Sequence, residues 1–102
     1  MMEILLCCQY GASTAMVEAR IAEEAKKRNL DVKVQARPYS RLNEFCDSAD
    51  IILLGPQMGY KLEEIKKKYP SKTEVTMVID YLDYGMMDGA SILDKALALL
   101  EK

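Results

Sequence analysis

Short apolar runs alternate with longer amphipathic stretches along this chain of 102 residues. Four apolar runs have the length of β-strands and cover residues 3–7, 32–36, 51–54 and 75–79. The first and third runs are almost purely apolar, which is typical of strands buried on both faces. Residues 32–36 alternate apolar and polar side chains, as an edge strand with one solvated face does.

Helical spacing fills the intervals between these runs. Val17, Ile21 and Ala25 lie four residues apart and predict a helix that ends at about Arg28, with Asn29 as its stop. Further helices are predicted over residues 42–47, from Leu62 to Tyr69, and along the apolar stripe from Ile92 to Leu100. Residues 55–59 and 80–89 are predicted to be loops.

A strand followed by a helix, four times over, predicts an α/β fold. We expect one flavodoxin-like domain over residues 1–102, an open parallel four-stranded sheet in the order 2-1-3-4 with helices on both faces. The chain reverses direction between strands 1 and 3 in that order. The crevice at this point would be lined by residues 8–14 and 55–60, and ligands of such sheets bind there.

Charge and hydropathy exclude some partners. The chain has 14 Lys+Arg against 16 Asp+Glu, a formal net charge of −2, and no basic stripe, which argues against nucleic-acid binding. Its apolar runs are far shorter than the roughly 20 residues that cross a bilayer. The first residues lack the basic flank and apolar stretch of a secretory signal. We therefore expect a cytoplasmic protein.

The residue types limit the chemistry further. The chain has no histidine and three cysteines, two of them adjacent at Cys7 and Cys8. No metal site is expected, because histidine and C-x-x-C pairs are both missing. A Ser-His or Cys-His pair within the chain is also excluded. Any nucleophile must be activated by backbone or helix electrostatics.

Residues 8–14, Cys-Gln-Tyr-Gly-Ala-Ser-Thr, carry the candidate chemistry. They follow a buried strand, contain Gly11, and open a helix, so they can turn several backbone N–H groups toward one point. The helix N-terminus adds about half a positive charge there. Ser13 and Thr14 can cap the helix and offer hydroxyl donors. Such a loop would hold an anion and would favour the thiolate form of a cysteine at its mouth.

Spacing alone leaves alternatives open. A cysteine at the end of a buried strand also serves as a small apolar residue, and Ser-Thr is an ordinary helix cap. Spacing does not choose between Cys7 and Cys8, although Cys7 continues the apolar strand and Cys8 begins the polar turn. Cys46, in a short amphipathic helix, is interpreted as structural.

Three segments, in order, resemble a known family. Residues 8–14 resemble the C-x-x-G-x-S-T loop of the enzyme IIB components of the sugar phosphotransferase system (PTS), of the lactose/cellobiose/chitobiose type. Residues 53–57 resemble the LLGPQ segment of that branch, and residues 79–89 resemble its ID-x-x-x-YG-x-x-DG segment. The match is collinear over nearly the whole chain.

The resemblance implies a phosphotransferase in which Cys8 is phosphorylated. Cys8 would accept phosphate from a histidine of the IIA protein and pass it to a sugar held by the membrane-embedded IIC component. The donor histidine then lies on another chain. No cofactor is implied, and the protein would associate peripherally with the membrane transporter. The sugar, whether cellobiose, lactose, chitobiose or another, is expected to be selected mainly by the membrane component.

Backbone N–H groups are expected to form the phosphate cradle. The residues assigned to it are Gln9, Tyr10, Gly11, Ala12, Ser13 and Thr14. Tyr84 and Gly85, at the same edge of the sheet, are candidates for a partner-docking surface, and the alternative is that Tyr84 packs over the sheet end. Asp80 and Asp83 are interpreted as loop caps. Three methionines in nearby loops are candidates for an adaptable apolar patch: Met58, Met86 and Met87.

Two rival functions share the predicted fold. Low-molecular-weight phosphatases and arsenate reductases resemble the loop but carry C-x5-R-S/T, and the position of the arginine is Thr14 here. Without the bidentate clamp of an arginine, attack by water should be slow. A non-catalytic binding module is the second rival. A receiver domain would need acidic residues where Cys7 and Cys8 stand, and a flavin carrier would be yellow.

Overall fold

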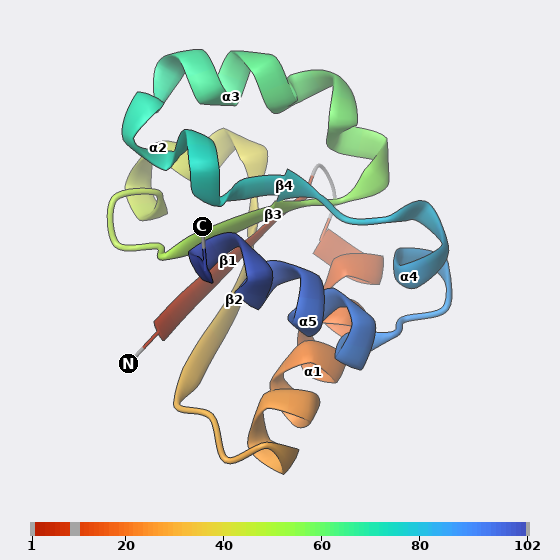
Figure 1. Ribbon diagram of the computed structural model, residues 1–102. Coiled ribbons are helices and arrows are strands. Elements are labelled where there is room, and N and C mark those ends of the chain that lie inside the picture. The colour runs from red at the N-terminus through yellow and green to blue at the C-terminus, as the bar shows by residue number, and fades with distance from the viewer. Residues whose placement is uncertain (1, 9–10, 102) are drawn as a thin grey trace.

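The computed structural model describes residues 2–8 and 11–101, with the side chains of residues 11–13 left aside. Its four strands form one parallel sheet in the order β2-β1-β3-β4. The strands are β1 (Met2–Cys8), β2 (Val32–Pro38), β3 (Ile51–Leu54) and β4 (Thr76–Val78). The predicted strand order is confirmed, and β2 lies at an edge of the sheet, as its alternating pattern indicated (Figure 1).

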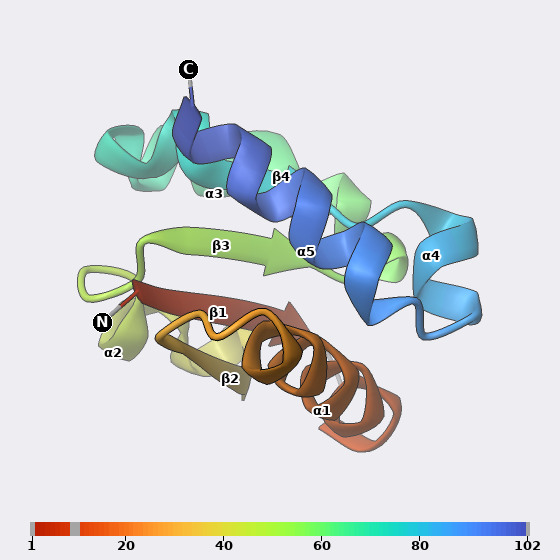
Figure 2. The ribbon, with the colours of Figure 1, turned by 60° about the horizontal axis from the view of Figure 1, so that its bottom comes forward.

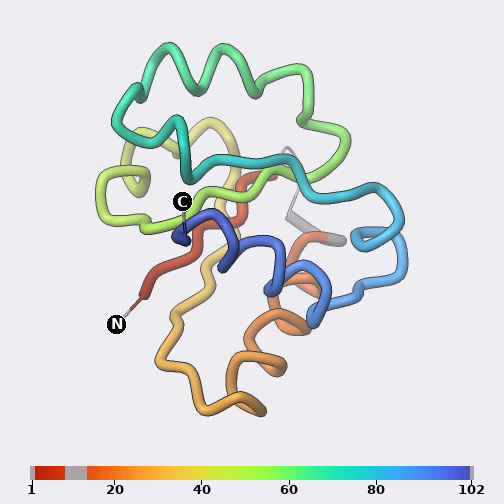
Figure 3. The backbone as a smooth tube through the Cα atoms, viewed as in Figure 1, coloured from red at the N-terminus to blue at the C-terminus, as the bar shows by residue number. Residues whose placement is uncertain are grey.

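Helices connect the strands. They are α1 (Gly11–Lys27), α2 (Leu42–Phe45), α3 (Leu62–Lys68), α4 (Tyr81–Gly85) and α5 (Gly89–Ala98). Short 3-10 turns cover Tyr39–Arg41, Pro56–Lys61, Pro70–Val75 and Leu99–Glu101. Figure 3 shows how each crossover returns the chain along a face of the sheet before the next strand begins.

The sheet separates two apolar layers, and helices lie on both of its sides in Figure 2. On one face, Ile4 and Leu6 of β1 pack with buried residues of α1 and α5. On the other face, Leu5 and Cys7 pack with buried residues of α2, α3 and the turn after β3. Both layers exist because successive strand residues point to opposite faces, and β1 and β3 are apolar at every position from Ile4 to Cys7 and from Ile51 to Leu54. The predicted helices on both faces are confirmed.

The predicted stop of the first helix is confirmed. Asn29 has a φ of 56°, in the left-handed region that asparagine tolerates better than most residues. The Leu30 N–H donates to the Ala25 carbonyl at 2.9 Å, and the Asn29 N–H donates to the Lys26 carbonyl at 3.1 Å. These two bonds form a Schellman motif, which satisfies the last carbonyl groups of α1.

Two elements differ from the sequence prediction. α1 begins at Gly11, so residues 11–14 form its first turn instead of a loop. Residues 80–89, predicted as a loop, contain the helix α4, which begins where the Asp80 carboxylate accepts hydrogen bonds from the backbone N–H groups of Leu82 and Asp83. The prediction missed α4 because five residues are too few to show a helical period.

α1 and α5 cross closely at Gly89, the first residue of α5. A Cβ atom at this position would overlap the backbone carbonyl group of Arg20 in α1. Glycine is therefore required by the approach of the two helices, which lie side by side in Figures 1 and 2. This contact ties α1, which follows Cys8, to the C-terminal helix.

Candidate functional site

Cys8 is the last residue of β1 and pairs with Pro38 of β2. Its side chain is 1% exposed, and its Sγ lies 3.7 Å from the backbone carbonyl oxygen of Arg37. The sequence placed Cys8 at the start of the polar turn, whereas the strand runs one residue further and includes it. Gln9 and Tyr10, both predicted to bind phosphate, lie outside the described residues.

Cys7 faces the opposite side of the sheet. It is 1% exposed and belongs to the apolar layer under α2 and α3. Burial, and secondarily the proximity of Cys8, raises the pKa of the Cys7 thiol to about 12. Cys7 is therefore a neutral thiol at pH 7. Cys46 lies in the same layer, and burial raises the pKa of its thiol as well.

The N-terminus of α1 comes close after Cys8 in the chain. Only two residues separate Cys8 from Gly11, where the helical backbone begins. The first backbone N–H groups of a helix have no partner within it, and the helix dipole makes this end positive. The backbone of residues 11–13 belongs to this first turn. The start of a 17-residue helix directly after the cysteine is an arrangement that can hold a phosphoryl group.

Thr14 lies inside this first turn and is fully buried. The expectation that Ser13 and Thr14 cap the helix is wrong, because the helix begins before them at Gly11. The Thr14 Oγ1 lies 3.2 Å from the Tyr84 hydroxyl oxygen, at hydrogen-bond distance. Whether Thr14 also acts as a phosphate donor stays a prediction.

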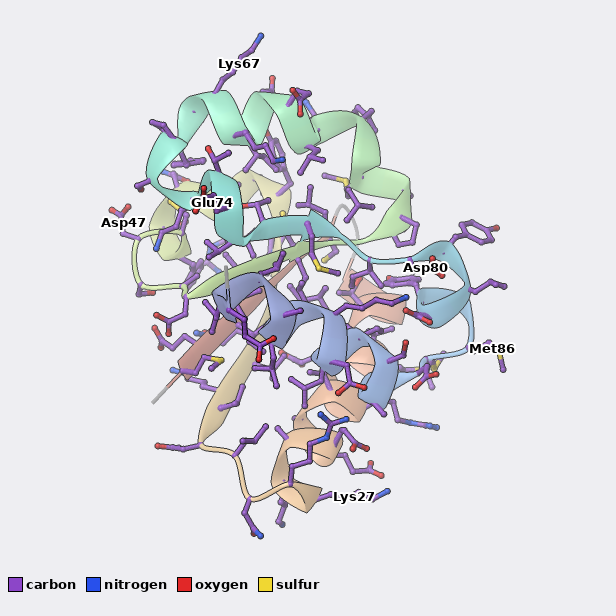
Figure 4. All side chains as sticks on the ribbon, in the orientation of Figure 1. Lys27, Asp47, Lys67, Glu74, Asp80 and Met86 are labelled. Atoms are coloured by element: carbon purple, nitrogen blue, oxygen red, sulfur yellow. The ribbon has the colours of Figure 1, made fainter. Side chains whose placement is uncertain are left out.

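α4 brings Tyr84 to this position. Asp80 caps the helix, as the sequence indicated for this residue (Figure 4 labels its side chain). Asp83 was expected to be a loop cap as well, but it lies inside α4, and its carboxylate accepts from Lys95 Nζ at 2.7 Å and from the Ser91 hydroxyl at 3.1 Å. The hydrogen bond from Lys95 holds the pKa of the Asp83 carboxyl below its usual value. α4 is thus attached to α5.

A pocket of about 450 Å³ opens beside Tyr84 at the carboxyl edge of the sheet. Its described walls are Pro56 and Gln57 after β3 and Tyr81, Tyr84 and Gly85 of α4. The segment after β3 lines this pocket, as the topology predicted, whereas residues 8–14 are not among its described walls. Tyr81 was not predicted from the sequence to lie at this site, although an Asp that follows a predicted strand, at residue 80, is a signal for a helix start.

The three candidate methionines differ in their exposure to solvent. Met86 is 77% exposed, and its side chain points away from the body of the molecule in Figure 4. Met87 packs against the α1–α5 layer. Met58 is buried in the opposite layer, so its placement in an exposed apolar patch is wrong. The turn Pro56–Lys61 folds Met58 inward because the Met58 N–H donates to the Gly55 carbonyl at 2.8 Å.

The described residues offer no group of three or more His, Cys, Asp or Glu side chains that could hold a metal ion. Within the same part of the chain, no helix is both long and apolar enough to span a bilayer.

Comparison with known proteins decides the family. The model of the PTS system lactose/cellobiose-specific IIB subunit matches residues 3–95. The chain belongs to this family. It is 32% identical over 100 residues to the PTS system oligo-beta-mannoside-specific EIIB component of Bacillus subtilis, covering 98% of this chain and 97% of that protein. It is 30% identical over 98 residues to the PTS system cellobiose-specific EIIB component of Lactococcus lactis, covering 91% of each.

Solved structures agree with the fold. The lactose-specific IIB domain of Streptococcus pneumoniae superposes with a TM-score of 0.83 at 18% identity, covering 95% of each chain. The cellobiose-specific IIB protein of Borrelia burgdorferi gives 0.77 at 33% identity, covering 96% of this chain and 90% of that chain. A low-molecular-weight protein tyrosine phosphatase from T. tengcongensis gives 0.64 at 12% identity over 96% of this chain and 99% of that one, which shows a shared fold alone. The IIB chain therefore has the flavodoxin-like architecture that its sequence predicted.

Proposed function

We propose that this IIB component carries a phosphoryl group on Cys8 between a phosphohistidine of a IIA protein and a sugar bound by a membrane IIC component. IIB components are phosphotransferases and work with IIA and IIC partners in general. The observation that carries the assignment to Cys8 is its place at the end of β1, with only two residues between it and Gly11, the N-terminus of α1. The chain has no histidine, so the donor imidazole belongs to the partner.

In this proposal the phosphoryl group is transferred in two steps. The Cys8 thiolate attacks phosphorus, and an S–P bond forms while the P–N bond of the phosphohistidine breaks and the imidazole leaves with the bonding electrons. A sugar hydroxyl oxygen then attacks phosphorus, and the P–S bond breaks and returns the thiolate, while the hydroxyl proton passes to water. Backbone N–H groups at the start of α1, with those of Gln9 and Tyr10, would stabilise the equatorial phosphoryl oxygens.

Cys7 is the rival acceptor that the structure argues against. Its neutral thiol lies in the α2–α3 layer, on the face of the sheet away from α1. Thiolates and not thiols are the nucleophiles, so Cys7 is unsuited to the reaction at neutral pH. Its register partner Arg37 stacks on the Phe45 ring, with 4.9 Å between the guanidinium carbon and the ring centre.

A phosphatase activity is disfavoured by Thr14. The position that would hold the arginine clamp of a phosphatase is occupied by a fully buried hydroxyl bonded to Tyr84. A threonine side chain carries no positive charge that could stabilise the charge that develops when water attacks. The phosphocysteine should therefore survive long enough to reach the sugar.

The acceptor is proposed to be a sugar of the kinds named for the relatives of this chain, which include oligo-beta-mannoside and cellobiose. The choice among such sugars is expected to lie mainly with the membrane component. Tyr84 and Gly85 border the pocket at the carboxyl edge of the sheet, where the partners would have to approach Cys8. We retain Gly85, which is exposed, as part of the docking surface.

Phosphorylation by a phosphorylated IIA protein tests the assignment. Intact mass should rise by one phosphoryl group, and peptide mapping should place it on Cys8. Cys8→Ser should abolish this sulfur-linked phosphoryl label, while Cys7→Ser and Cys46→Ser should keep it. Cys8 is 1% exposed, so the phosphoryl group of the donor must reach a sulfur atom that is buried in this structure. Loss of the label in Cys7→Ser, with Cys8→Ser still labelled, would overturn the proposal.

A further inference from the structure

A polar side chain buried in the first turn of α1 makes a long-range hydrogen bond. Thr14 is 0% exposed, and its Oγ1 lies 3.2 Å from the hydroxyl of Tyr84, 70 residues further along the chain. A buried hydroxyl needs hydrogen-bond partners, since leaving one unsatisfied costs about 1–3 kcal/mol. The Thr14–Tyr84 contact is therefore a fixed point between the beginning of α1 and α4.

Tyr84 is held from several directions. Its backbone N–H donates to the Asp80 carbonyl at 2.9 Å, within a helix that Asp80 also caps. Its ring packs against the α1–α5 layer. The neighbouring Asp83 is bound by Lys95 and Ser91 of α5. The hydroxyl of Tyr84 thus reaches Thr14 from a rigid support, and it does not simply project into solvent.

The bond acts on the part of α1 that matters for anion binding. The first turn of a helix presents the N–H groups that have no partner within the helix. Their positions relative to Cys8 decide how well they meet the phosphoryl oxygens in the transition state, where small displacements are costly. Thr14 belongs to this turn, so a bond that fixes Thr14 also fixes the turn against the rest of the fold.

We infer that Tyr84 is a positioning residue for phosphoryl transfer: through its hydroxyl bond to Thr14 it holds the first turn of α1 in register with Cys8. The inference rests on the proposed function, in which Cys8 carries the phosphoryl group. It changes the role that the sequence suggested for Tyr84. Tyr84 borders the pocket, but its hydroxyl lies at hydrogen-bond distance from Thr14, which is fully buried.

Kinetics of phosphoryl uptake separate positioning from docking. The rate of loading from phosphorylated IIA is measured over a range of IIA concentrations for wild type, Tyr84→Phe, Thr14→Val and the double variant. Each single variant should lower the maximal rate about tenfold and leave the half-saturating concentration unchanged. The double variant should be no slower than either single variant, because all three lack the same bond.

Tyr69→Phe is the matched control. Tyr69 follows α3 and precedes β4, so it lies at the opposite edge of the sheet, where it packs against the apolar layer that contains Cys46. This variant also removes the hydroxyl of a partly buried tyrosine, so it reports what a general loss of stability does to the rate. Its maximal rate should equal that of wild type under conditions in which all variants are folded.

Three results would overturn the inference. Tyr84→Phe could load at the wild-type maximal rate, it could raise the half-saturating concentration alone, or Tyr69→Phe could slow equally.

Amide hydrogen exchange of α1 in the unphosphorylated protein is an independent test. Tyr84→Phe should accelerate exchange in the first two turns of α1 at least threefold more than in its last two turns. If wild type takes no phosphoryl group on Cys8 while this exchange difference is present, the proposed function fails and the structural link stands. Absence of the exchange difference overturns the link itself.

Discussion

Cys7 and Cys8 are neighbours in the chain and lie on opposite faces of the sheet. Cys7 packs in the α2–α3 layer, and Cys8 ends β1 next to the Arg37 carbonyl. Alternation along the strand is the cause, since consecutive side chains point in opposite directions. Two identical thiols are thereby given different surroundings, and only the one on the α1 side is a candidate to exchange a phosphoryl group.

The buried Cys7 thiol predicts an alkaline limit to stability. Its pKa is about 12 in the folded protein against an ordinary value of 9.0, so the folded state binds more protons between these values. The free energy of unfolding should therefore be unaffected below about pH 9 and should fall as pH rises toward 12, by at most about 1.4 kcal/mol per pH unit for this group. Urea unfolding at intervals from pH 8 to 11 measures the fall.

Two variants assign this fall to its sources. Cys7→Ala should reduce the part that begins near pH 9, to which the raised pKa of the Cys46 thiol also contributes. Tyr39→Phe should affect only the part above pH 10, because the hydrogen bond to Glu64 raises the pKa of Tyr39 from 10.0 to about 12. An unchanged curve for Cys7→Ala would show that the thiol does not stay neutral in the folded state.

The crossing of α1 and α5 predicts a large difference between two glycines. Gly89→Ala places a methyl group against the Arg20 carbonyl, and separating the helices should destabilise the protein by about 1–3 kcal/mol. Gly85→Ala is the control, because a Cβ there meets no atom within 4 Å. Thermal unfolding of both variants checks this. Equal melting temperatures would mean that the helices can move apart freely.

The cap of α4 predicts an indirect effect on the site. Asp80→Ala removes the carboxylate that accepts from Leu82 and Asp83, and should lower the free energy of unfolding by about 1 kcal/mol. Asp80→Asn keeps an acceptor and should retain most of that stability. Because α4 carries Tyr84, Asp80→Ala should also slow phosphoryl uptake. A variant as fast and as stable as Asp80→Asn would show that the cap is dispensable.

Thr14→Arg tests why the phosphocysteine should persist. An arginine at this position would supply the clamp found in phosphatases and should shorten the lifetime of the phosphoprotein. Thr14 is fully buried, however, so the substitution also breaks the bond to Tyr84 and should lower the melting temperature. The lifetime is therefore compared with that of Thr14→Val at a temperature where both are folded. Equal lifetimes would contradict the expected role of the cation.

Local pattern was sufficient for most of the fold. The apolar run 51–54 coincides with β3, and the spacing of Val17, Ile21 and Ala25 identified the buried side of α1. These predictions succeed because burial repeats every two residues in strands and about every 3.6 in helices. The pattern did not predict two helical segments next to the site, which are the start of α1 at Gly11 and the helix α4 at Tyr81–Gly85. The first turn of α1 and the five residues of α4 are each too short to show a helical repeat.

The sequence by itself determined the α/β class, the strand order, the family, and the single loop where a cysteine precedes a helix. It could do so because the apolar periods of strands and helices, and the motifs that resemble the family, each lie within short stretches of the chain. The tertiary structure decided that Thr14 is buried against Tyr84, that Met58 points inward, and that Gly89 must admit the Arg20 carbonyl. These depend on contacts between residues far apart in the chain, which a local pattern of polarity does not encode.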